Sequence, residues 1–309
     1  MKRPIALTGA TGFIGRELQR QLRAAGHPVR ALQRPGSRRA DALLPGVERV
    51  AVGLDDPPAL EDALRGVDAV ISCAGAVRGA CPADFAPANV AGVANLARAA
   101  AAQPDAPFFL HISSLAATRP MLSDYAASKA AGEAVLRDAE GLTWCILRPP
   151  AVYGPGDKEL LPLFRAMRCG LAVIVGPARQ RLSLLHVEDL ARAALAVLDH
   201  RDACRGRVFG LDDGTPTGHG WPAIVAAGRG RLPVLSLHVP RALLGALARL
   251  NLGLARVTGH APMLTPGKVR ELSEPEWLCD NSELHAATGW RPRVALQVGI
   301  ERLFAAHSS

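Results

Sequence analysis

The sequence of 309 residues has few aromatic residues, only four lysines and no paired cysteine motif. Aromatic side chains make up 4% of the chain, so we do not expect a nucleic-acid interface of interleaved basic and aromatic residues, despite a formal charge of +8. The six cysteines stand far apart, and no HExxH motif or Cys/His cluster is present. We therefore expect reduced cysteines, as in cytoplasmic proteins, and no metal site.

Long hydrophobic runs are absent as well. No apolar segment reaches the roughly 18–20 residues that a membrane-spanning helix needs. The apolar stretch near the N-terminus is interrupted by Thr and Gly and then meets charged residues, which is not typical of a signal peptide. With 49% hydrophobic and 21% charged residues, the composition excludes collagen-like and coiled-coil proteins and predicts a folded, cytoplasmic protein.

Short apolar strands alternate with helical segments through the first half of the chain. This alternation predicts an α/β fold, a doubly wound parallel sheet with helices on both faces. We expect a first domain at 1–155 and, at 156–309, further sheet and helix elements interleaved with a small C-terminal substrate-binding region. The boundary is soft, because segments such as 171–213 could return to the first sheet. The expected strands are 4–8, 29–32, 47–52, 68–72, 108–113 and 143–147, and the expected helices of this half are 13–25, 58–64, 90–102 and 125–139.

Three glycines spaced three residues apart, Gly9, Gly12 and Gly15, follow the first expected strand and enter the first expected helix. Glycine permits the tight turn, the close approach of a pyrophosphate to the backbone, and the packing of helix on strand. Phosphates then meet unpaired N–H groups at the positive end of the helix. An ordinary strand-to-helix turn is the alternative, but the strand, the spacing and the helix agree in predicting a dinucleotide site.

Tyr125, one of two tyrosines in the chain, lies four residues before Lys129. On a helix this spacing places both side chains on one face, where the ammonium is expected to lower the phenol pKa. A tyrosine tuned in this way can exchange a proton with a substrate oxygen. Ser113 and Ser114 follow the fifth expected strand, at the edge where open α/β sheets carry their sites. The alternative is a surface helix that carries a Tyr–Lys pair by chance.

These segments together resemble the short-chain dehydrogenase/reductase superfamily, in particular its extended branch, the NAD-dependent epimerase/dehydratase-like family. The resemblance rests on Thr8-Gly-Ala-Thr-Gly-Phe-Ile-Gly15 and on the Ser, Tyr and Lys in chain order, with weaker similarity along the whole chain. It implies a Rossmann-type NAD(P)-binding fold. By this resemblance, Tyr125 is the general acid/base, Lys129 tunes it and holds the nicotinamide ribose, and Ser114 binds the reacting oxygen.

The resemblance also implies which residues of this chain contact the cofactor. The family's Asp near the adenine has Asp55, Asp56 or neither as its counterpart in this chain, and Asp55 is the candidate. In the glycine turn, the implied contacts are Gly9, Thr11, Gly12, Phe13, Ile14 and Gly15. The others are Asp55 after the third strand, Ala74 and Gly75 after the fourth, the pair Tyr125 and Lys129, and Pro149 in the loop that passes the nicotinamide.

The end of the second expected strand favours NADP(H) over NAD(H). NAD-binding folds have Asp or Glu here to accept hydrogen bonds from the ribose 2′-hydroxyl, whereas this chain has Arg34 and Arg38 and no acid before Asp41. An arginine binds a 2′-phosphate through charge-assisted hydrogen bonds, and a carboxylate would repel it. We expect Arg34, and then Arg38, to be the ligands. A solvated basic loop is the alternative.

Three functions compete. The complete Ser, Tyr and Lys set favours an oxidoreductase that moves a hydride between nicotinamide C4 and a carbonyl or secondary alcohol. A nucleotide-sugar epimerase or dehydratase with retained NAD is the second, although the interval from Ser114 to Tyr125 is short and Leu115-Ala116 stands where a dehydratase would carry acids. The third is a non-catalytic NADPH-binding structural protein resembling the complex I accessory subunit.

The stretch 232–264 is largely apolar, with interspersed arginines. If this stretch lines the substrate site, it favours an apolar substrate. It could equally contact an acidic membrane surface, and a plain amphipathic helix packed on the core is the third interpretation. A small-molecule substrate is the expected partner, with no nucleic acid, and a homodimer is an expectation from the resemblance alone.

Overall fold

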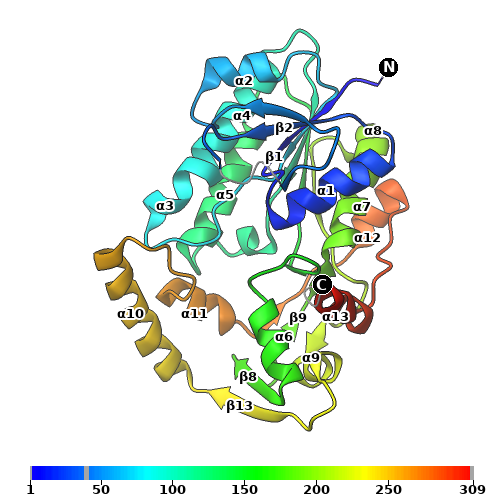
Figure 1. The fold of residues 1–309 in the computed structure, drawn as a ribbon. Coiled ribbons are helices and arrows are strands. Elements are labelled where there is room, and N and C mark those ends of the chain that lie inside the picture. The colour runs from blue at the N-terminus through cyan, green and yellow to red at the C-terminus, as the bar shows by residue number, and fades with distance from the viewer. Residues whose placement is uncertain (1, 38–41, 307–309) are drawn as a thin grey trace.

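The computed structural model describes residues 2–37 and 42–306, and its centre is a sheet of seven parallel strands (Figure 1). Four of these strands lie at consecutive positions in the sheet and are almost wholly buried, as expected for apolar strands covered on both faces. The strand order is β11-β6-β5-β4-β1-β2-β3. Their bounds are β1 Ile5–Thr8, β2 Val29–Gln33, β3 Glu48–Ala51, β4 Ala69–Ser72, β5 Phe108–Ile112, β6 Trp144–Arg148 and β11 Arg207–Gly210.

Helices cover both faces of this sheet, which confirms the doubly wound fold. Figure 1 shows α2, α4 and α5 on one side and α1, α7 and α12 on the other. Each layer closes over its own apolar cluster. The bounds of these helices are α1 Phe13–Ala24, α2 Pro57–Ala63, α4 Gly92–Ala101, α5 Asp124–Arg137, α7 Val187–Asp199 and α12 Ser282–Thr288; the short α3 Pro82–Ala86 and α8 Arg201–Cys204 join them.

The strand order reverses between β1 and β4, which are neighbours in the sheet although two strands separate them in the chain. In open α/β sheets such a reversal leaves a crevice at the carboxyl ends of the two strands, and ligands bind there. The glycine turn follows β1, and Ala74 and Gly75 follow β4. The fold therefore brings both expected cofactor segments to this edge.

The second half of the chain divides between the sheet and a smaller part. The strand β11 returns from the expected 156–309 half to pair with β6. The smaller part lies beyond the carboxyl end of the sheet (Figure 1) and contains a two-stranded parallel sheet of β8 and β13. Its elements are α6 Leu161–Arg168, β8 Leu171–Val175, α9 Trp221–Gly228, β13 Leu235–Val239, α10 Arg241–Thr258, α11 Pro266–Leu272 and α13 Leu296–Ala305, with the short strands β7 Ala151–Tyr153, β9 Arg181–Leu182, β10 Leu184–His186, β12 His219–Gly220 and β14 Glu276–Trp277.

No helix within residues 2–37 and 42–306 is both long and apolar enough to span a membrane. The longest is α10, and its sequence includes three arginines.

Asp189, in the first turn of α7, ties the C-terminal tail to the sheet layer. Its buried carboxylate accepts the backbone N–H groups of Arg293 at 3.1 Å and Val294 at 2.9 Å and pairs with Arg192. Burial raises the pKa of Asp189, and these N–H groups and the Arg192 charge act in the opposite direction. Removing this carboxylate would leave buried donors without a partner, which costs more than the bonds contribute.

We expect Asp189→Ala to lower the free energy of unfolding by about 3–5 kcal/mol, as for the loss of one partner of a buried charge pair. Urea denaturation measures this loss. Asp199→Ala, at the exposed end of the same helix, should cost no more than about 0.5 kcal/mol. Equal losses in the two variants would contradict the anchoring role of Asp189.

Candidate active site

The glycine turn holds β1, α1 and the loop after β4 in close contact. Gly9 has a φ of +67°, and a Cβ there would stand 2.8 Å from the Ala74 nitrogen. A Cβ on Gly15 would stand 2.1 Å from the Gly9 oxygen. Gly12 is the N-cap of α1, no side chain caps this helix end, and its first turn has no acid. The unpaired N–H groups of Phe13 and the next residues therefore suit a phosphate group.

Two polar side chains fix the loop after β4 beside this turn. The Thr8 hydroxyl accepts the N–H groups of Cys73 at 3.0 Å and Ala74 at 3.1 Å. Asn89 is buried and binds both backbone groups of Ala76, at 2.8 and 2.9 Å. A Cβ on Gly75 would stand 3.0 Å from the Asn89 Oδ1 atom, so the loop runs close against this side chain. Thr8 was not among the sequence-predicted residues, because its role depends on a partner 65 positions away.

The structure brings Ser114, Tyr125 and Lys129 together next to this edge of the sheet. Tyr125 and Lys129 lie one turn apart on α5, and the Ser114 side chain lies close enough to the Tyr125 hydroxyl to lower its pKa. Lys129 is buried and donates to the Ile112 carbonyl oxygen at 2.9 Å. Ser113 instead points to Glu133, to which it donates a hydrogen bond of 2.5 Å. Of the two serines, Ser114 is therefore the one that contacts the tyrosine.

Burial dominates the ionisation of this group. It raises the pKa of Tyr125 above its usual value of 10, and the Glu271 charge adds to the rise, although the Ser114 hydrogen bond opposes it. Burial also lowers the pKa of Lys129 from 10.5 to about 8. The predicted lowering of the Tyr125 pKa is therefore wrong for the chain by itself. At neutral pH the phenol keeps its proton, which suits a proton donor.

The end of β2 carries one of the two predicted 2′-phosphate ligands. Arg34 directly follows the strand and is exposed. Arg38 lies outside the described residues. Arg30 is engaged elsewhere, because its guanidinium donates to Glu48 at 2.9 Å. Asp56 caps α2 by accepting the Ala59 N–H group, and Asp55 beside it is exposed.

A buried charge network under the serines was missed by sequence reasoning. Glu133 is buried on α5 and accepts hydrogen bonds from Arg148 at 2.8 and 2.5 Å and from Arg137 at 2.8 Å, in addition to Ser113. Pro149, the next residue after Arg148, is also buried, and its carbonyl accepts the Leu115 N–H group at 2.8 Å. This network fixes the start of the loop between β5 and α5 through Ser113 and Leu115. Its only signal in the sequence is a glutamate one turn after Lys129.

The helix α11 docks on the start of α5, beside Tyr125. Ser123, the N-cap of α5, donates a hydrogen bond to the buried Glu271, whose carboxylate also accepts from Lys268 at 2.8 Å. Gly267 lies so close that a Cβ there would stand 2.9 Å from the Ser123 Cβ. A residue nearly 150 positions downstream thus acts on the Tyr125 pKa, which no local pattern indicates.

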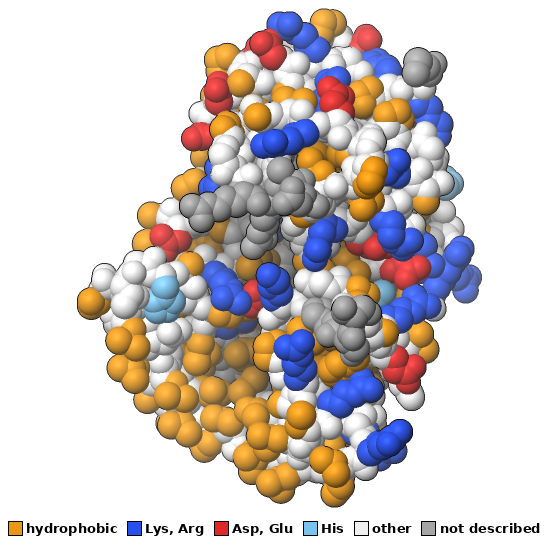
Figure 2. All heavy atoms as spheres, viewed as in Figure 1, with side chains coloured by type: hydrophobic (Ala, Val, Ile, Leu, Met, Phe, Trp, Pro, Cys, Tyr) orange, Lys and Arg blue, Asp and Glu red, His pale blue; other side chains and the backbone are white. Residues whose placement is uncertain are grey.

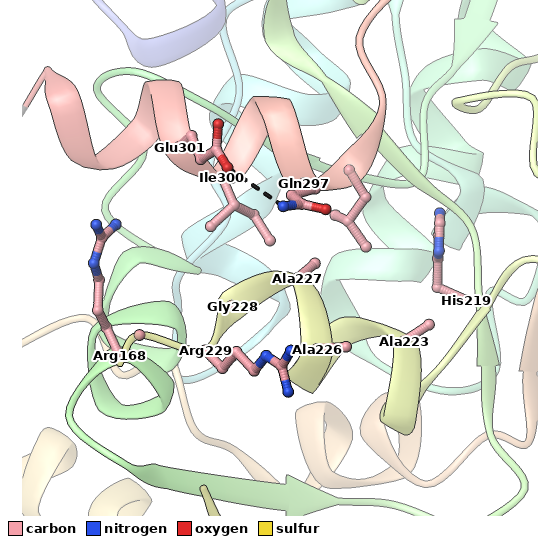
Figure 3. Close-up of a pocket in the computed structure, with 12 residues that line it drawn as sticks. Arg168, His219, Ala223, Ala226, Ala227, Gly228, Arg229, Gln297, Ile300 and Glu301 are labelled. Carbon is pink, nitrogen blue, oxygen red and sulfur yellow. Dashed lines mark hydrogen bonds between the residues drawn. The ribbon is translucent and has the colours of Figure 1, made fainter. Parts of the chain in front are cut away.

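A separate surface pocket of about 550 Å³ lies between α9 and α13. Figure 3 shows Arg229 on one wall, with Gln297 and Glu301 across from it and Arg168 at one end. None of the sequence-predicted site residues lines this pocket. It is therefore distinct from the site at the carboxyl edge of the central sheet.

Comparisons with known proteins agree on one family. Residues 5–211 match the model of the NAD dependent epimerase/dehydratase family. The chain is 35% identical over 287 residues to the ceramide reductase of Caulobacter vibrioides, covering 88% of this chain and 85% of that protein. It is 29% identical to the 2-alkyl-3-oxoalkanoate reductase of Stenotrophomonas maltophilia, covering 99% of both. The UDP-glucuronic acid 4-epimerase of Bacillus cereus, solved with UDP-glucuronic acid and NAD, shares the fold, with a TM-score of 0.73 at 19% identity over 100% of this chain and 99% of that one.

Lys129 makes stability depend on pH in the alkaline range. Since its pKa falls from 10.5 to about 8 on folding, the unfolded chain binds more protons between these values, and stability rises with pH across this window. We expect the free energy of unfolding of the wild type to gain about 2 kcal/mol relative to Lys129→Met between pH 7 and pH 10. Urea denaturation of both proteins at each pH measures the gain. Parallel pH profiles would show that Lys129 keeps an ordinary pKa.

Proposed function

The chain belongs to the NAD-dependent epimerase/dehydratase family and is an NAD(P)-dependent oxidoreductase, and we propose that it uses NADPH to reduce a ketone on an alkyl-chain substrate. The observation that carries this proposal is the placement of Ser114 beside a still-protonated Tyr125, one helical turn from the buried Lys129. This arrangement can deliver a proton to a carbonyl oxygen. The product would be a secondary alcohol.

The chain's own residues handle the oxygen of the substrate. When bound, the nicotinamide supplies the hydride that forms the new C–H bond. The Ser114 hydroxyl donates a hydrogen bond to the carbonyl oxygen, and Tyr125 transfers its phenolic proton to that oxygen as the electron pair of the C=O bond moves onto it. The tyrosinate that remains is stabilised by Ser114 and by the Lys129 ammonium, and it regains a proton from solvent.

Lys129 has a second proposed role in holding the cofactor. Its ammonium is buried, and its bond to the Ile112 carbonyl fixes the side chain at the end of β5. The two other protons of the ammonium would hydrogen-bond the hydroxyl groups of the nicotinamide ribose. The glycine turn and the open start of α1 would bind the pyrophosphate, and Asp55 the adenosine end.

The preference for NADPH rests on Arg34. Arg34 is exposed immediately after β2, where an NAD enzyme would carry an acid. A guanidinium at this position attracts the 2′-phosphate and forms charge-assisted hydrogen bonds with it. With no carboxylate there to repel the phosphate, NADPH is favoured.

An apolar substrate is supported by the residues around Tyr125. Phe85 is buried with its ring centroid 6.2 Å from that of Tyr125. Met121 and Val77 lie on the loops before α5 and after β4, and they are 90% and 51% exposed. Because these loops adjoin Tyr125 and the glycine turn, their apolar side chains would be available to an apolar ligand. Two of the similar proteins are named as reductases of ceramide and of 2-alkyl-3-oxoalkanoates, both of which carry alkyl chains.

The proposal is tested by incubating the protein with a 2-alkyl-3-oxoalkanoate and NADPH. The turnover is measured as the loss of NADPH absorbance. We expect Tyr125→Phe to lower the turnover number by about 10²–10⁴-fold, as for a general acid, while calorimetry shows unchanged binding of NADPH. Retained activity in this variant would remove Tyr125 from the reaction. Tightly retained NAD, with turnover of UDP-glucuronic acid and not of the oxoalkanoate, would favour an epimerase instead. NADPH that binds but reacts with neither would favour a structural role.

The cofactor preference is tested by Arg34→Ala. Loss of a charge-assisted hydrogen bond, worth about 1.5–3 kcal/mol, should weaken NADPH binding by at least about tenfold. Binding of NADH, which lacks the 2′-phosphate, should change by less than about threefold. Arg49→Ala, an exposed arginine on the neighbouring β3, is the matched control for general loss of positive charge. Equal weakening of both cofactors by Arg34→Ala would overturn the assignment.

A further inference from the structure

The smaller part of the molecule exposes a continuous set of large apolar side chains. Eight of the twelve exposed large hydrophobic residues within the described chain lie between positions 232 and 257. We call this set the α10 face; it consists of Leu232, Leu235, Leu237, Leu243, Leu247, Leu250, Leu254 and Val257. Figure 2 shows apolar side chains gathered over this part of the surface, at the lower left. A patch of this kind marks an interaction surface.

The helix α10 carries two apolar stripes, and only one of them is packed. Leu244, Ala248 and Ala255 are buried, and the cluster that holds the first two includes Val269 of α11. The second stripe recurs at spacings of four and three residues from Leu243 to Val257, and its members are 45–86% exposed. At 100° per residue it spans an arc of about 80°. The second stripe thus forms a narrow apolar face with no packing partner in the described chain.

Nearly all of the net charge of the protein lies in the segment that carries this face. Between Asp213 and Glu271 there is no acidic residue, while the segment holds seven arginines and lysines. These seven charges account for all but one of the formal +8 of the chain. Arg249 and Arg256 are exposed on the side of α10 that faces away from the second stripe. Of the seven, Lys268 pairs with Glu271 and Arg229 lines the pocket between α9 and α13. The positive charge beside the α10 face is therefore that of the exposed arginines from position 231 to position 256.

We propose that the α10 face docks on the surface of an anionic lipid bilayer. In this arrangement the leucine stripe enters the acyl boundary, and the arginines on the flank and back of the helix lie in the headgroup layer, as in interfacial amphipathic helices. Negative headgroups would meet the exposed Arg231, Arg241, Arg249 and Arg256, in a stretch of sequence without an acid, and this attraction steers the face to the membrane. A second copy of the chain is the poorer occupant, because two such segments would bring like charges together.

A series of hydrogen bonds connects the segment that carries the α10 face to the candidate active site. Asn251 of α10 donates to the Leu264 carbonyl at 2.9 Å, and α11 follows directly. Glu271 of α11 binds Ser123, the N-cap of the helix that carries Tyr125. The Pro262 carbonyl also accepts the Gly79 N–H group, at 3.3 Å, from the loop after β4. Docking would therefore hold the mouth of the site at the membrane, where an alkyl-chain substrate resides.

Flotation of the full chain with vesicles tests this proposal without substrate or cofactor, so its outcome is independent of the reaction. One set of vesicles is phosphatidylcholine alone, and the other also contains phosphatidylglycerol. We expect the protein to bind the anionic vesicles, to bind neutral ones more weakly, and to lose binding as salt is raised. The double variant Leu250→Ser/Leu254→Ser should bind at least about tenfold more weakly, since two leucines no longer leave water.

Matched controls separate the face from the rest of the surface. Val298→Ser removes an apolar side chain that is 42% exposed on α13 and should leave vesicle binding unchanged. Arg249→Gln/Arg256→Gln should reduce the preference for anionic vesicles, whereas Arg65→Gln, next to α2 on the central-sheet body, should not. Circular dichroism checks that each variant is folded. Absence of vesicle binding, or full binding by the folded leucine variant, would overturn the proposal. A dimer in solution that the leucine variant dissociates would assign the face to a second copy.

Discussion

The close approach of Gly9 to the backbone of Ala74 is the constraint on which the architecture of the site depends. A Cβ at this position would stand 2.8 Å from the Ala74 nitrogen, so only glycine allows the turn after β1 to meet the loop after β4. This contact lies where the strand order reverses. The open start of α1 and the loop after β4 both take their positions from it. Cofactor chemistry is possible at this edge because Gly9, Gly12 and Gly15 put no side chain into the turn.

The polar groups at the site depend on a second constraint, the burial of charge. Glu133 and Lys129 lie on the same helix and are both buried, but they are satisfied differently. Glu133 holds two arginines and Ser113 and so supports the backbone beneath the site. Lys129 has a backbone carbonyl as its partner and a pKa lowered to about 8 by burial. The Lys129 ammonium keeps N–H protons that a ligand would accept as hydrogen bonds. The Glu133 carboxylate is occupied by its protein partners and serves to hold the backbone in place.

The fold and the local site motifs could be predicted from the sequence because each rests on short-range signals. The apolar strands, the glycine spacing and the Tyr-to-Lys interval are all readable within about ten residues, and the observed sheet follows from them. What could not be predicted depends on distant partners. Glu271 lies 146 positions after Tyr125, and the pairing of β8 with β13 joins segments about 60 residues apart. The expected lowering of the Tyr125 pKa failed for the same reason, since desolvation is a property of the packed chain.

The distribution of charge connects the two parts of the molecule. Outside the segment between Asp213 and Glu271, acids and bases nearly balance, and twelve of the arginines described there pair with carboxylates. Inside the segment, the exposed arginines from position 231 to position 256 have no acidic neighbour in the sequence, and the same stretch carries leucines that the fold leaves uncovered. Neither feature contributes to folding stability, because exposed leucines gain nothing from burial and unpaired like charges repel. An anionic lipid bilayer accounts for both the exposed leucines and the unpaired arginines, because its interior is apolar and its headgroups are negatively charged. The bilayer surface would lie next to the loops around Tyr125. The protein would therefore dock on the same membrane from which it takes its alkyl-chain substrate.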